Sequence, residues 1–480
     1  MTVRNPADRR NGTIVMAISA TTRLSEFIAN VRELPTEVSE KAKLHIADTL
    51  ACIYAGSASE AVALLERVCA PSDDNAPFIA PGLGRWSDPA LAAMLIGVCA
   101  HADDFDDTSE YSMNGHPSAP IVSALIPTAV ATKASGMAMV RAYAVGIEVA
   151  CKLGSAIGTA HTRRGWHTMS TLGTLGAAAA AAHLRGLHTG QTERALAIAS
   201  SFAGGLLGNT GTMTKSLHCG RAAQAAYLAA ALAEQGFSAG ADILEAENGF
   251  LAALTDRSKD RIDLSGIGDV WELVSPGLAV KLYPCCSCTH LAIDGAIEIQ
   301  RRHAIDPERI EQVTCAVREE CTHYLRFPNP TTGIEGKFSM NYTVAVALAR
   351  GKVTLDDFET AALGHDDIAL LMPKVHMVVR PDEKDAGEIE VILKGGLRLT
   401  AYRDVPRGSP ETPADWEDII GKLRDGLARA GRLRPVHPET LFAGLREMDK
   451  QSGISRSLAH MIFQQALPGN TGQNNSVLGK

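Results

Sequence analysis

Apolar residues recur at steps of three and four through most of residues 36–236, the spacing that places them on one face of a helix. The clearest stripe runs from Val38 to Ile53 and predicts a helix over residues 36–54. Gly236 fits the end of the last helix in this series, because glycine readily adopts left-handed backbone angles after a helix. The other segments predicted to be helical are residues 90–100, 120–133, 139–158, 192–202 and 221–235, and an Ala/Gly-rich helix that opens at residues 165–168.

The pattern changes near residue 281. Residues 313–317 and 375–379 alternate apolar with less apolar positions, which is typical of half-buried strands. Two further runs within residues 388–402 flank Gly395-Gly396, a pair that predicts a hairpin turn. Helical spacing returns in residues 337–350, 412–430 and 438–448, and Thr412-Pro413 is the expected start of the second of these.

These elements predict a mostly α protein, with a large all-α helical domain and an inserted smaller α/β lid domain. Residues 20–271 form the first part of the helical domain, and residues 272–404 form the lid. Residues 405–465 are a helical return that completes the all-α domain. Residues 466–480 are rich in glycine and asparagine, so we expect a disordered tail.

Composition excludes several classes of protein. A formal net charge of −8 offers no basic surface for nucleic acid. Residues 1–19 lack the apolar core of a secretory signal, and no apolar stretch has the flanks of a membrane span. The ten cysteines are irregularly spaced, mostly within apolar runs, which indicates free thiols in a reducing compartment. We therefore expect a cytoplasmic protein without a membrane partner.

Residues 101–118 stand out because a strongly polar stretch interrupts apolar sequence on both sides. They follow an apolar run entered through Asp88-Pro89, so we expect a buried helix whose end delivers side chains to the interior. The ordinary interpretation of clustered carboxylates is a solvated turn, since like charges repel unless water, cations or protonation relieve them. The apolar flanks favour an interior site instead. The aspartates are Asp103, Asp104, Asp106 and Asp107.

Other polar residues gather beside glycines at expected helix ends. The backbone amides at a helix N-terminus favour an anion and disfavour a charged imidazole. His167 is expected at such a position, so its charged form should be disfavoured. Taken singly, such residues are usually core histidines or solvated lysines. Together they suit a small polycarboxylate, because ammoniums and hydroxyls bind carboxylates and histidine transfers protons. The residues concerned are His116, His167, Thr212, Thr214, Lys215 and Lys281, and the same segments also include His290 and Tyr342.

Cys285-Cys286-Ser287-Cys288 invites a metal interpretation. A structural zinc site usually needs a second pair of ligands at the typical spacing, and adjacent cysteines do not easily ligate one cluster. We interpret these residues as small buried thiols. The sequence therefore predicts no metal and no cofactor.

Five successive segments resemble the motifs of the MmgE/PrpD family, which includes 2-methylcitrate dehydratase, cis-aconitate decarboxylase and iminodisuccinate epimerase. They are residues 101–118, 165–176, 208–220, 281–290 and 335–345. The resemblance covers residues 20–450 and implies a homodimer that needs no metal. By motif it implies an active site formed by Asp104, Thr108, His116, His167, Lys215 and Lys281, together with Tyr342 and His290.

Dehydration, decarboxylation and epimerisation can each pass through a carbanion that a neighbouring carboxylate stabilises as an enediolate. Lys215 and Lys281 are the candidates that stabilise its charge, with Thr212 and Thr214 as supplementary donors. His116 would move the proton, with its tautomer and charge set by Asp104. The loop from Thr108 to His116 has a length closer to that of the dehydratases. We therefore predict a cofactor-independent lyase of the 2-methylcitrate dehydratase type, with the decarboxylase and the epimerase as alternatives.

Two other classes of protein stay open. Asp103-Asp104-Phe105-Asp106-Asp107 in a helical context also resembles the Mg²⁺-binding aspartates of prenyl-diphosphate enzymes. We find no convincing second acidic motif, and aromatic residues, which line such pockets, make up only 5% of the chain. In the other class, Lys215 and Lys281 bind a carboxylate without any turnover.

Overall fold

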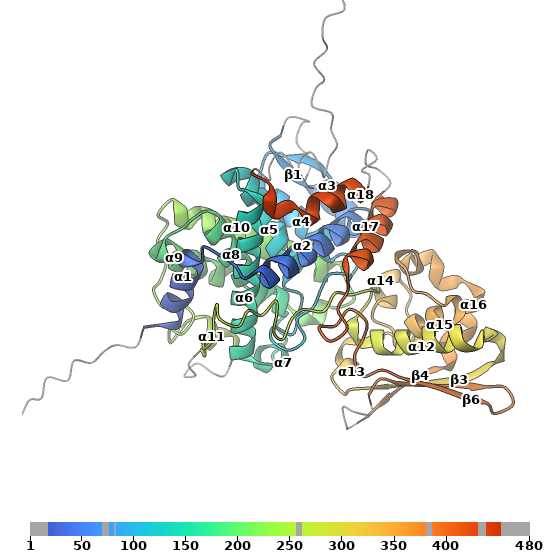
Figure 1. Cartoon of the computed structure of the whole chain (residues 1–480). Coiled ribbons are helices and arrows are strands. Elements are labelled where there is room, and N and C mark those ends of the chain that lie inside the picture. Colours follow the sequence, from blue (N-terminus) through green and yellow to red (C-terminus); the bar gives the residue numbers. More distant parts are fainter. Residues whose placement is uncertain are drawn as a thin grey trace, which may run out of the picture.

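The computed structural model describes residues 18–69, 76–80, 83–255, 262–380, 386–430 and 438–452. Residues 1–17 of the N-terminal segment and the expected tail, residues 466–480, lie outside the described residues. The described part is mostly helical and contains a four-stranded sheet in its C-terminal region, as predicted (Figure 1). None of the helices in this part is long and apolar enough to span a membrane.

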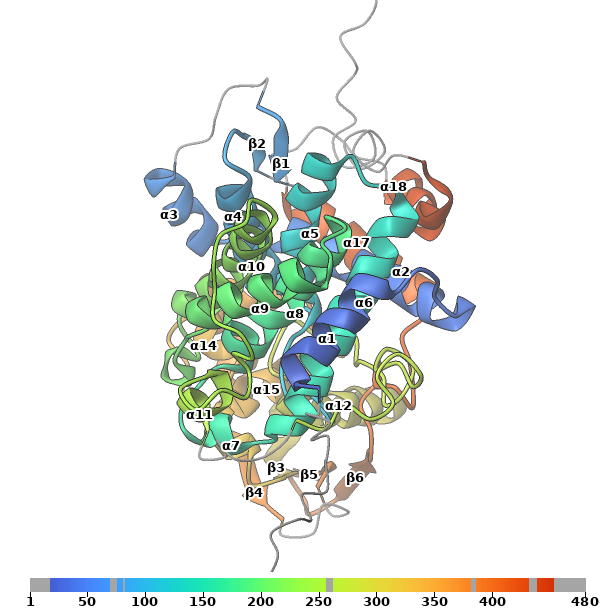
Figure 2. The ribbon, with the colours of Figure 1, turned by 90° about the vertical axis from the view of Figure 1, so that its left-hand side faces the viewer.

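A bundle of long helices forms the larger part of the molecule (Figure 2). A Cβ atom added at Gly176 would lie only 2.7 Å from the Ala150 Cβ, and one at Gly97 would lie 2.8 Å from the Gly220 Cα. Small residues thus let helices approach closely, as expected for the Ala/Gly-rich segment. The helices are α4 (Pro89–His101), α5 (Ser118–Thr132), α6 (Gly136–Ile157), α8 (Thr168–Leu184), α9 (Thr189–Phe202) and α10 (Met213–Glu234).

Segments from both ends of the described chain complete the bundle. Helix α17 (Trp416–Ala430), from the C-terminal part of the chain, packs along α2 (Thr36–Gly56), and Leu423 joins the same core as Ile46. The bundle therefore closes only when the chain returns to it. The remaining elements are α1 (Ala20–Asn30), α3 (Glu60–Val68), α7 (Ala160–Arg163), α11 (Phe250–Leu254), α18 (Pro438–Arg446), β1 (Phe78–Ala80) and β2 (Gly84–Trp86).

The start of α17 differs from the prediction. Asp415 caps the helix, since its Oδ1 accepts from the backbone N–H groups of Glu417 and Asp418 at 2.8 and 3.0 Å. The Thr412 hydroxyl donates instead to the carbonyl of Pro406 at 2.8 Å. The expected start at Thr412-Pro413 was wrong because this side chain holds the preceding loop.

The sheet lies in a second lobe, residues 283–402, which we call the α/β lobe. Its strand order is β4-β3-β5-β6, with β3 parallel to β4 and antiparallel to β5. The predicted hairpin turns at Gly395 and Gly396, whose φ values of +99° and +86° suit glycine. Helices α12 and α15 pack on the sheet (Figure 1). The elements are α12 (His290–His303), β3 (Ile310–Val317), α13 (Cys321–Tyr324), α14 (Gly333–Gly336), α15 (Met340–Arg350), α16 (Asp366–Leu371), β4 (Val375–Val379), β5 (Glu388–Leu393) and β6 (Arg398–Tyr402).

The bundle and the α/β lobe have separate hydrophobic cores. The chain enters the lobe just after Val280 and leaves it before Gly408. The Val280 N–H donates to the Gly408 carbonyl at 2.8 Å, so the two crossing segments lie side by side. Side chains from the bundle and from the lobe line the cavity that forms the candidate site.

Candidate active site

The acidic stretch forms a buried turn at the C-terminal end of α4. Asp88 begins this helix by accepting from the backbone N–H groups of Ala90 and Leu91 at 2.8 and 3.2 Å, and the helix ends at His101. Asp104 then adopts φ +52°, a left-handed conformation that Asp tolerates better than most residues. The four aspartates are only 0–4% exposed, so the interpretation as a solvated turn is wrong.

Partners from distant segments compensate the outer aspartates of the turn. Asp103 lies 2.8 Å from Lys337 Nζ and 2.9 Å from Arg429 Nη1. Asp107 lies 2.8 Å from Nδ1 of His45. Because each carboxylate faces its own protein partner, the turn does not resemble a set of aspartates that converge on Mg²⁺. This pairing of the carboxylates with protein groups does not support the prenyl-diphosphate interpretation.

Asp104 lies between two lysines. Lys215 Nζ, in the first turn of α10, is 2.5 Å from its Oδ1, and Lys281 Nζ is 2.8 Å from its Oδ2. Burial opposes ionisation of Asp104, but the two ammoniums outweigh it and hold the pKa of this carboxyl well below its usual value. Burial also opposes the charge of Lys281, yet the Asp104 carboxylate raises the pKa of that lysine. Asp104 and Lys281 are therefore poised to stay charged near neutral pH.

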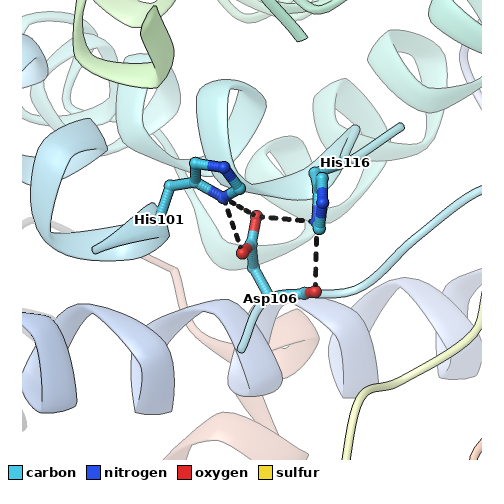
Figure 3. Close-up of side chains that lie close together, drawn as sticks. All are labelled: His101, Asp106 and His116. Carbon is cyan, nitrogen blue, oxygen red and sulfur yellow. Dashed lines mark hydrogen bonds and ion pairs between the residues drawn. The ribbon is translucent and has the colours of Figure 1, made fainter. Parts of the chain in front are cut away.

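Asp106 lies between two imidazoles (Figure 3). His101 Nδ1 is 2.8 and 3.0 Å from its two carboxylate oxygens. His116 Nδ1 is 3.4 Å from the nearer oxygen and 3.3 Å from the Asp106 backbone carbonyl. Burial holds the pKa of both histidines well below the usual value, which favours the neutral form of each ring. We expected Asp104 to set the tautomer of His116, but Asp104 lies 3.7 Å from the other ring nitrogen, Nε2.

His167 is the N-cap residue of α8, as predicted. Its Nδ1 lies 3.0 Å from Nδ1 of His218 on α10. Burial, followed by the nearby Lys215 ammonium, holds the pKa of His167 well below its usual value. A neutral imidazole was expected here from the helix dipole, but burial is the larger cause.

Several of these groups line a cavity of about 220 Å³ between the bundle and the α/β lobe. The lobe contributes Phe338 and Met340 to the opposite wall. The buried Thr108 Oγ1 has no hydrogen-bond partner among the described residues, which leaves it available to a ligand. Six residues predicted for the site line the cavity: Asp104, Thr108, His116, His167, Lys215 and Lys281.

Tyr342 and His290 do not line the cavity. Tyr342 is fully buried, and its hydroxyl donates to the backbone carbonyl of Asp357 within the α/β lobe. His290 is also buried, with Nε2 3.2 Å from the carbonyl oxygen of Cys285. The structure does not support their expected contact with substrate, because both polar groups already have partners inside the lobe.

Thr212 and Thr214 also lie away from the cavity. Both are exposed at the start of α10. The Thr212 hydroxyl donates to the backbone carbonyl of Asn209 at 2.8 Å. A helix directs adjacent residues to different faces, so Lys215 reaches the cavity while these two hydroxyls do not.

Sequence reasoning missed three side chains of the site: His101, Asp106 and His218. His101 ends the apolar helix three residues before Asp104, and Asp106 was one of four aspartates without a feature to distinguish it. His218 follows Lys215 by three residues, which places both on one helix face and was a usable signal.

His101, Asp106 and His116 have donor atoms within 4.8 Å of one another, close enough to hold a metal ion. The same atoms already contact one another, and Lys215 Nζ lies 2.7 Å from the free nitrogen of His101. An ammonium so close to the group makes it a poor cation site. All ten cysteines are free thiols, as expected, and Cys286 lines the cavity.

The family of the chain follows from comparison with known proteins. Residues 22–263 match the MmgE/PrpD N-terminal domain, and residues 283–435 match the MmgE/PrpD C-terminal domain. The chain belongs to the MmgE/PrpD family, which confirms the resemblance seen in its motifs.

Similar proteins with established names share most of their length with this chain. A cis-aconitate decarboxylase of Mus musculus is 29% identical over 418 residues, covering 83% of this chain and 84% of that protein. The cis-aconitate decarboxylase of Homo sapiens is 29% identical over 415 residues, covering 83% and 85%. One of Aspergillus terreus is 27% identical over 437 residues, covering 82% and 85%. The family and these relatives identify the protein as an enzyme of the lyase class.

Proposed function

We propose that the protein is a cofactor-independent lyase that decarboxylates cis-aconitate or a closely similar unsaturated polycarboxylate. The observation that carries the proposal is the pair of ammoniums on Asp104, beside the neutral imidazole of His116, in one cavity. The names of the relatives favour decarboxylation over the 2-methylcitrate dehydration that we expected from the sequence.

The reaction requires the kinds of side chain that line this cavity. Decarboxylation breaks the bond between the CH₂ carbon of cis-aconitate and its carboxylate, and CO₂ leaves. The electron pair spreads through the adjacent double bond into a second carboxylate, and a proton adds to the far carbon of that double bond to give itaconate. Lys215 and Lys281 stabilise the added negative charge, an effect worth several kcal/mol in a buried site.

His116 supplies the proton in this scheme. Its Nε2 faces the cavity, and burial lowers the pKa of the imidazole, which favours the neutral ring before substrate binds. A trianionic substrate beside Nε2 favours the imidazolium, so substrate and proton enter together. His116 then passes this proton to carbon, and the single proton consumed balances the loss of CO₂.

The loop from Thr108 to His116 had favoured the dehydratase. Ser109 and Gly115 exchange backbone hydrogen bonds of 2.8 and 3.2 Å, which close the loop at its base. Thr108 and His116 therefore both line the cavity despite the intervening residues. Loop length is a weak guide to the reaction for this reason.

The test is an assay of the purified protein against cis-aconitate, 2-methylcitrate and iminodisuccinate, with CO₂ release and NMR of the products as readouts. We expect CO₂ and itaconate from cis-aconitate alone, undiminished by a chelator, and a kcat at least about 10²-fold lower for Lys281→Met. Water loss from 2-methylcitrate, or epimerisation of iminodisuccinate, without CO₂ from cis-aconitate would overturn the proposal. Activity lost to the chelator and restored by a divalent metal would contradict metal independence.

A further inference from the structure

We propose that Asp106 is a positioning residue that fixes the tautomers of His101 and His116, and that His101 in turn holds the Lys215 ammonium at the cavity. The consequence for turnover rests on the proposed function, whereas the tautomers themselves are independent of any reaction. Neither His101 nor Asp106 lines the cavity, so both act through residues that do.

The tautomer of His101 follows from its two neighbours. Lys215 Nζ lies 2.7 Å from Nε2 of His101, and an ammonium can only donate, so Nε2 carries the lone pair. In a neutral imidazole the proton then sits on Nδ1, which lies 2.8 Å from an Asp106 oxygen. His101 is 2% exposed, so water does not compete for either nitrogen. The result is a series of hydrogen bonds from Asp106 through His101 to Lys215.

The tautomer of His116 follows from the same residue. Its Nδ1 faces the backbone carbonyl of Asp106 at 3.3 Å, and a carbonyl only accepts. Nδ1 therefore carries the proton, and Nε2 keeps its lone pair toward the cavity. That lone pair is what the proposed proton transfer needs, since the opposite tautomer would point its N–H at Asp104 instead.

One carboxylate thus serves two rings. The His101 and His116 ring centroids are 4.7 Å apart with an interplanar angle of 66°, and both Nδ1 atoms converge on Asp106 (Figure 3). Asp106 is fully buried, which keeps both imidazoles in one arrangement. In Asp106→Asn the amide has one oxygen and one N–H₂ group, so its donor faces the N–H of one ring. That ring must move or change tautomer.

The experiment measures histidine tautomers by NMR of the full-length protein labelled with isotopic nitrogen in histidine. Signals are assigned with His101→Gln and His116→Ala. We expect Nδ1–H tautomers at both positions in the wild type. In Asp106→Asn we expect either a changed tautomer or the displaced nitrogen signals of a moved ring at one of them. That variant should also lower kcat by at least about 10²-fold with little change in KM, because orientation of a proton-transfer group affects the reacting state.

Asp107→Asn is the matched control. It removes another fully buried carboxylate from the same turn, but its partners are His45 and the Ser118 hydroxyl, outside the site. Both site tautomers and kcat should stay near their wild-type values in this control. A purely structural role for Asp106 predicts equal effects in the two variants, and that result would overturn the proposal.

His101 supplies a second test if Asp106→Asn does not fold. His101→Ala removes the acceptor for Lys215, whereas the amide oxygen of His101→Gln can replace Nε2. We expect kcat to fall by about 10²-fold in the alanine variant and to recover by at least about tenfold in the glutamine variant. Equal loss in both, or an Nε2–H tautomer at His101 in the wild type, would refute the proposal. The proposal would also be refuted if adding a divalent metal shifted the histidine signals and if activity required the same metal.

The NMR readout separates this inference from the proposed function. A wild-type protein that fails to decarboxylate cis-aconitate but shows the two Nδ1–H tautomers refutes the function and keeps the positioning role. A protein that decarboxylates cis-aconitate but shows the opposite tautomers supports the proposed function and refutes the positioning role.

Discussion

Asp104→Asn tests the electrostatics of the site most directly. Asn tolerates the left-handed backbone at φ +52° as Asp does, so the substitution removes charge and preserves conformation. It leaves the ammoniums of Lys215 and Lys281 without their carboxylate, and Lys281 is only 3% exposed. Removing one partner of a buried ion pair costs about 3–5 kcal/mol. We expect the free energy of unfolding to fall by that amount near neutral pH.

A polycarboxylate should return part of this loss, because its carboxylates can take the place of the missing one. Ligand at about 100 times its Kd adds about 2.7 kcal/mol to the free energy of unfolding. Propane-1,2,3-tricarboxylate is a suitable unreactive probe, and urea unfolding followed by circular dichroism gives the free energies. At one fixed ligand concentration Asp104→Asn should gain more than the wild type, in which the Asp104 carboxylate competes for the same ammoniums.

Asp107→Asn again provides the control, because it deletes a buried carboxylate that faces His45 rather than a lysine. It should lose stability without an enhanced gain from the ligand. If Asp104→Asn unfolds at the wild-type urea concentration, or gains no more from the ligand than Asp107→Asn does, Asp104 does not compensate the two ammoniums and the reasoning fails.

Four further predictions concern the reaction and its pH dependence. Lys215→Met and Lys281→Met should each lower kcat by at least about 10²-fold and raise KM, since each ammonium binds a carboxylate and faces the enediolate; a rise in KM alone would indicate uniform binding. His116→Ala should lower kcat by at least about 10²-fold, and His290→Gln, which alters a ring outside the cavity, should lower it far less; equal losses would contradict the assigned proton donor. The buried histidines of the site have a lower pKa in the folded state than in the unfolded state. As the pH falls below about 6.5, only the unfolded state therefore takes up protons. The free energy of unfolding should then drop by up to about 1.4 kcal/mol per pH unit for each histidine. A urea midpoint unchanged between about pH 7 and pH 5 would contradict this linkage. Saturating tricarboxylate should protect the amides of residues 337–342 from hydrogen exchange if the α/β lobe closes on the ligand, whereas protection confined to the bundle would mean that the lobe is not a lid.

Most of the secondary structure could be predicted because its signals are local. The helix expected at residues 36–54 is Thr36–Gly56, and the strand at residues 375–379 is Val375–Val379. The expected start of α10 at residue 221 was wrong, since the helix begins at Met213. The polar residues beside glycines in residues 208–220 resemble a loop. Gly220 nevertheless lies inside the helix, where its lack of a side chain lets it pack against α4. Nor did we identify α1, α12 or the β1–β2 hairpin.

The pairing of side chains in the site was beyond local signals. Asp104 is 111 positions from Lys215 and 177 from Lys281, so only the folded bundle brings them together. Within the turn itself, Asp104 and Asp106 are equivalent candidates by sequence, and their roles divide only in three dimensions. Asp104, at φ +52°, faces the two ammoniums, whereas Asp106 faces the two imidazoles. Four aspartates fit in one buried turn because each of them meets a different set of partners. The same separation places a charged pair and a neutral proton carrier side by side in one cavity.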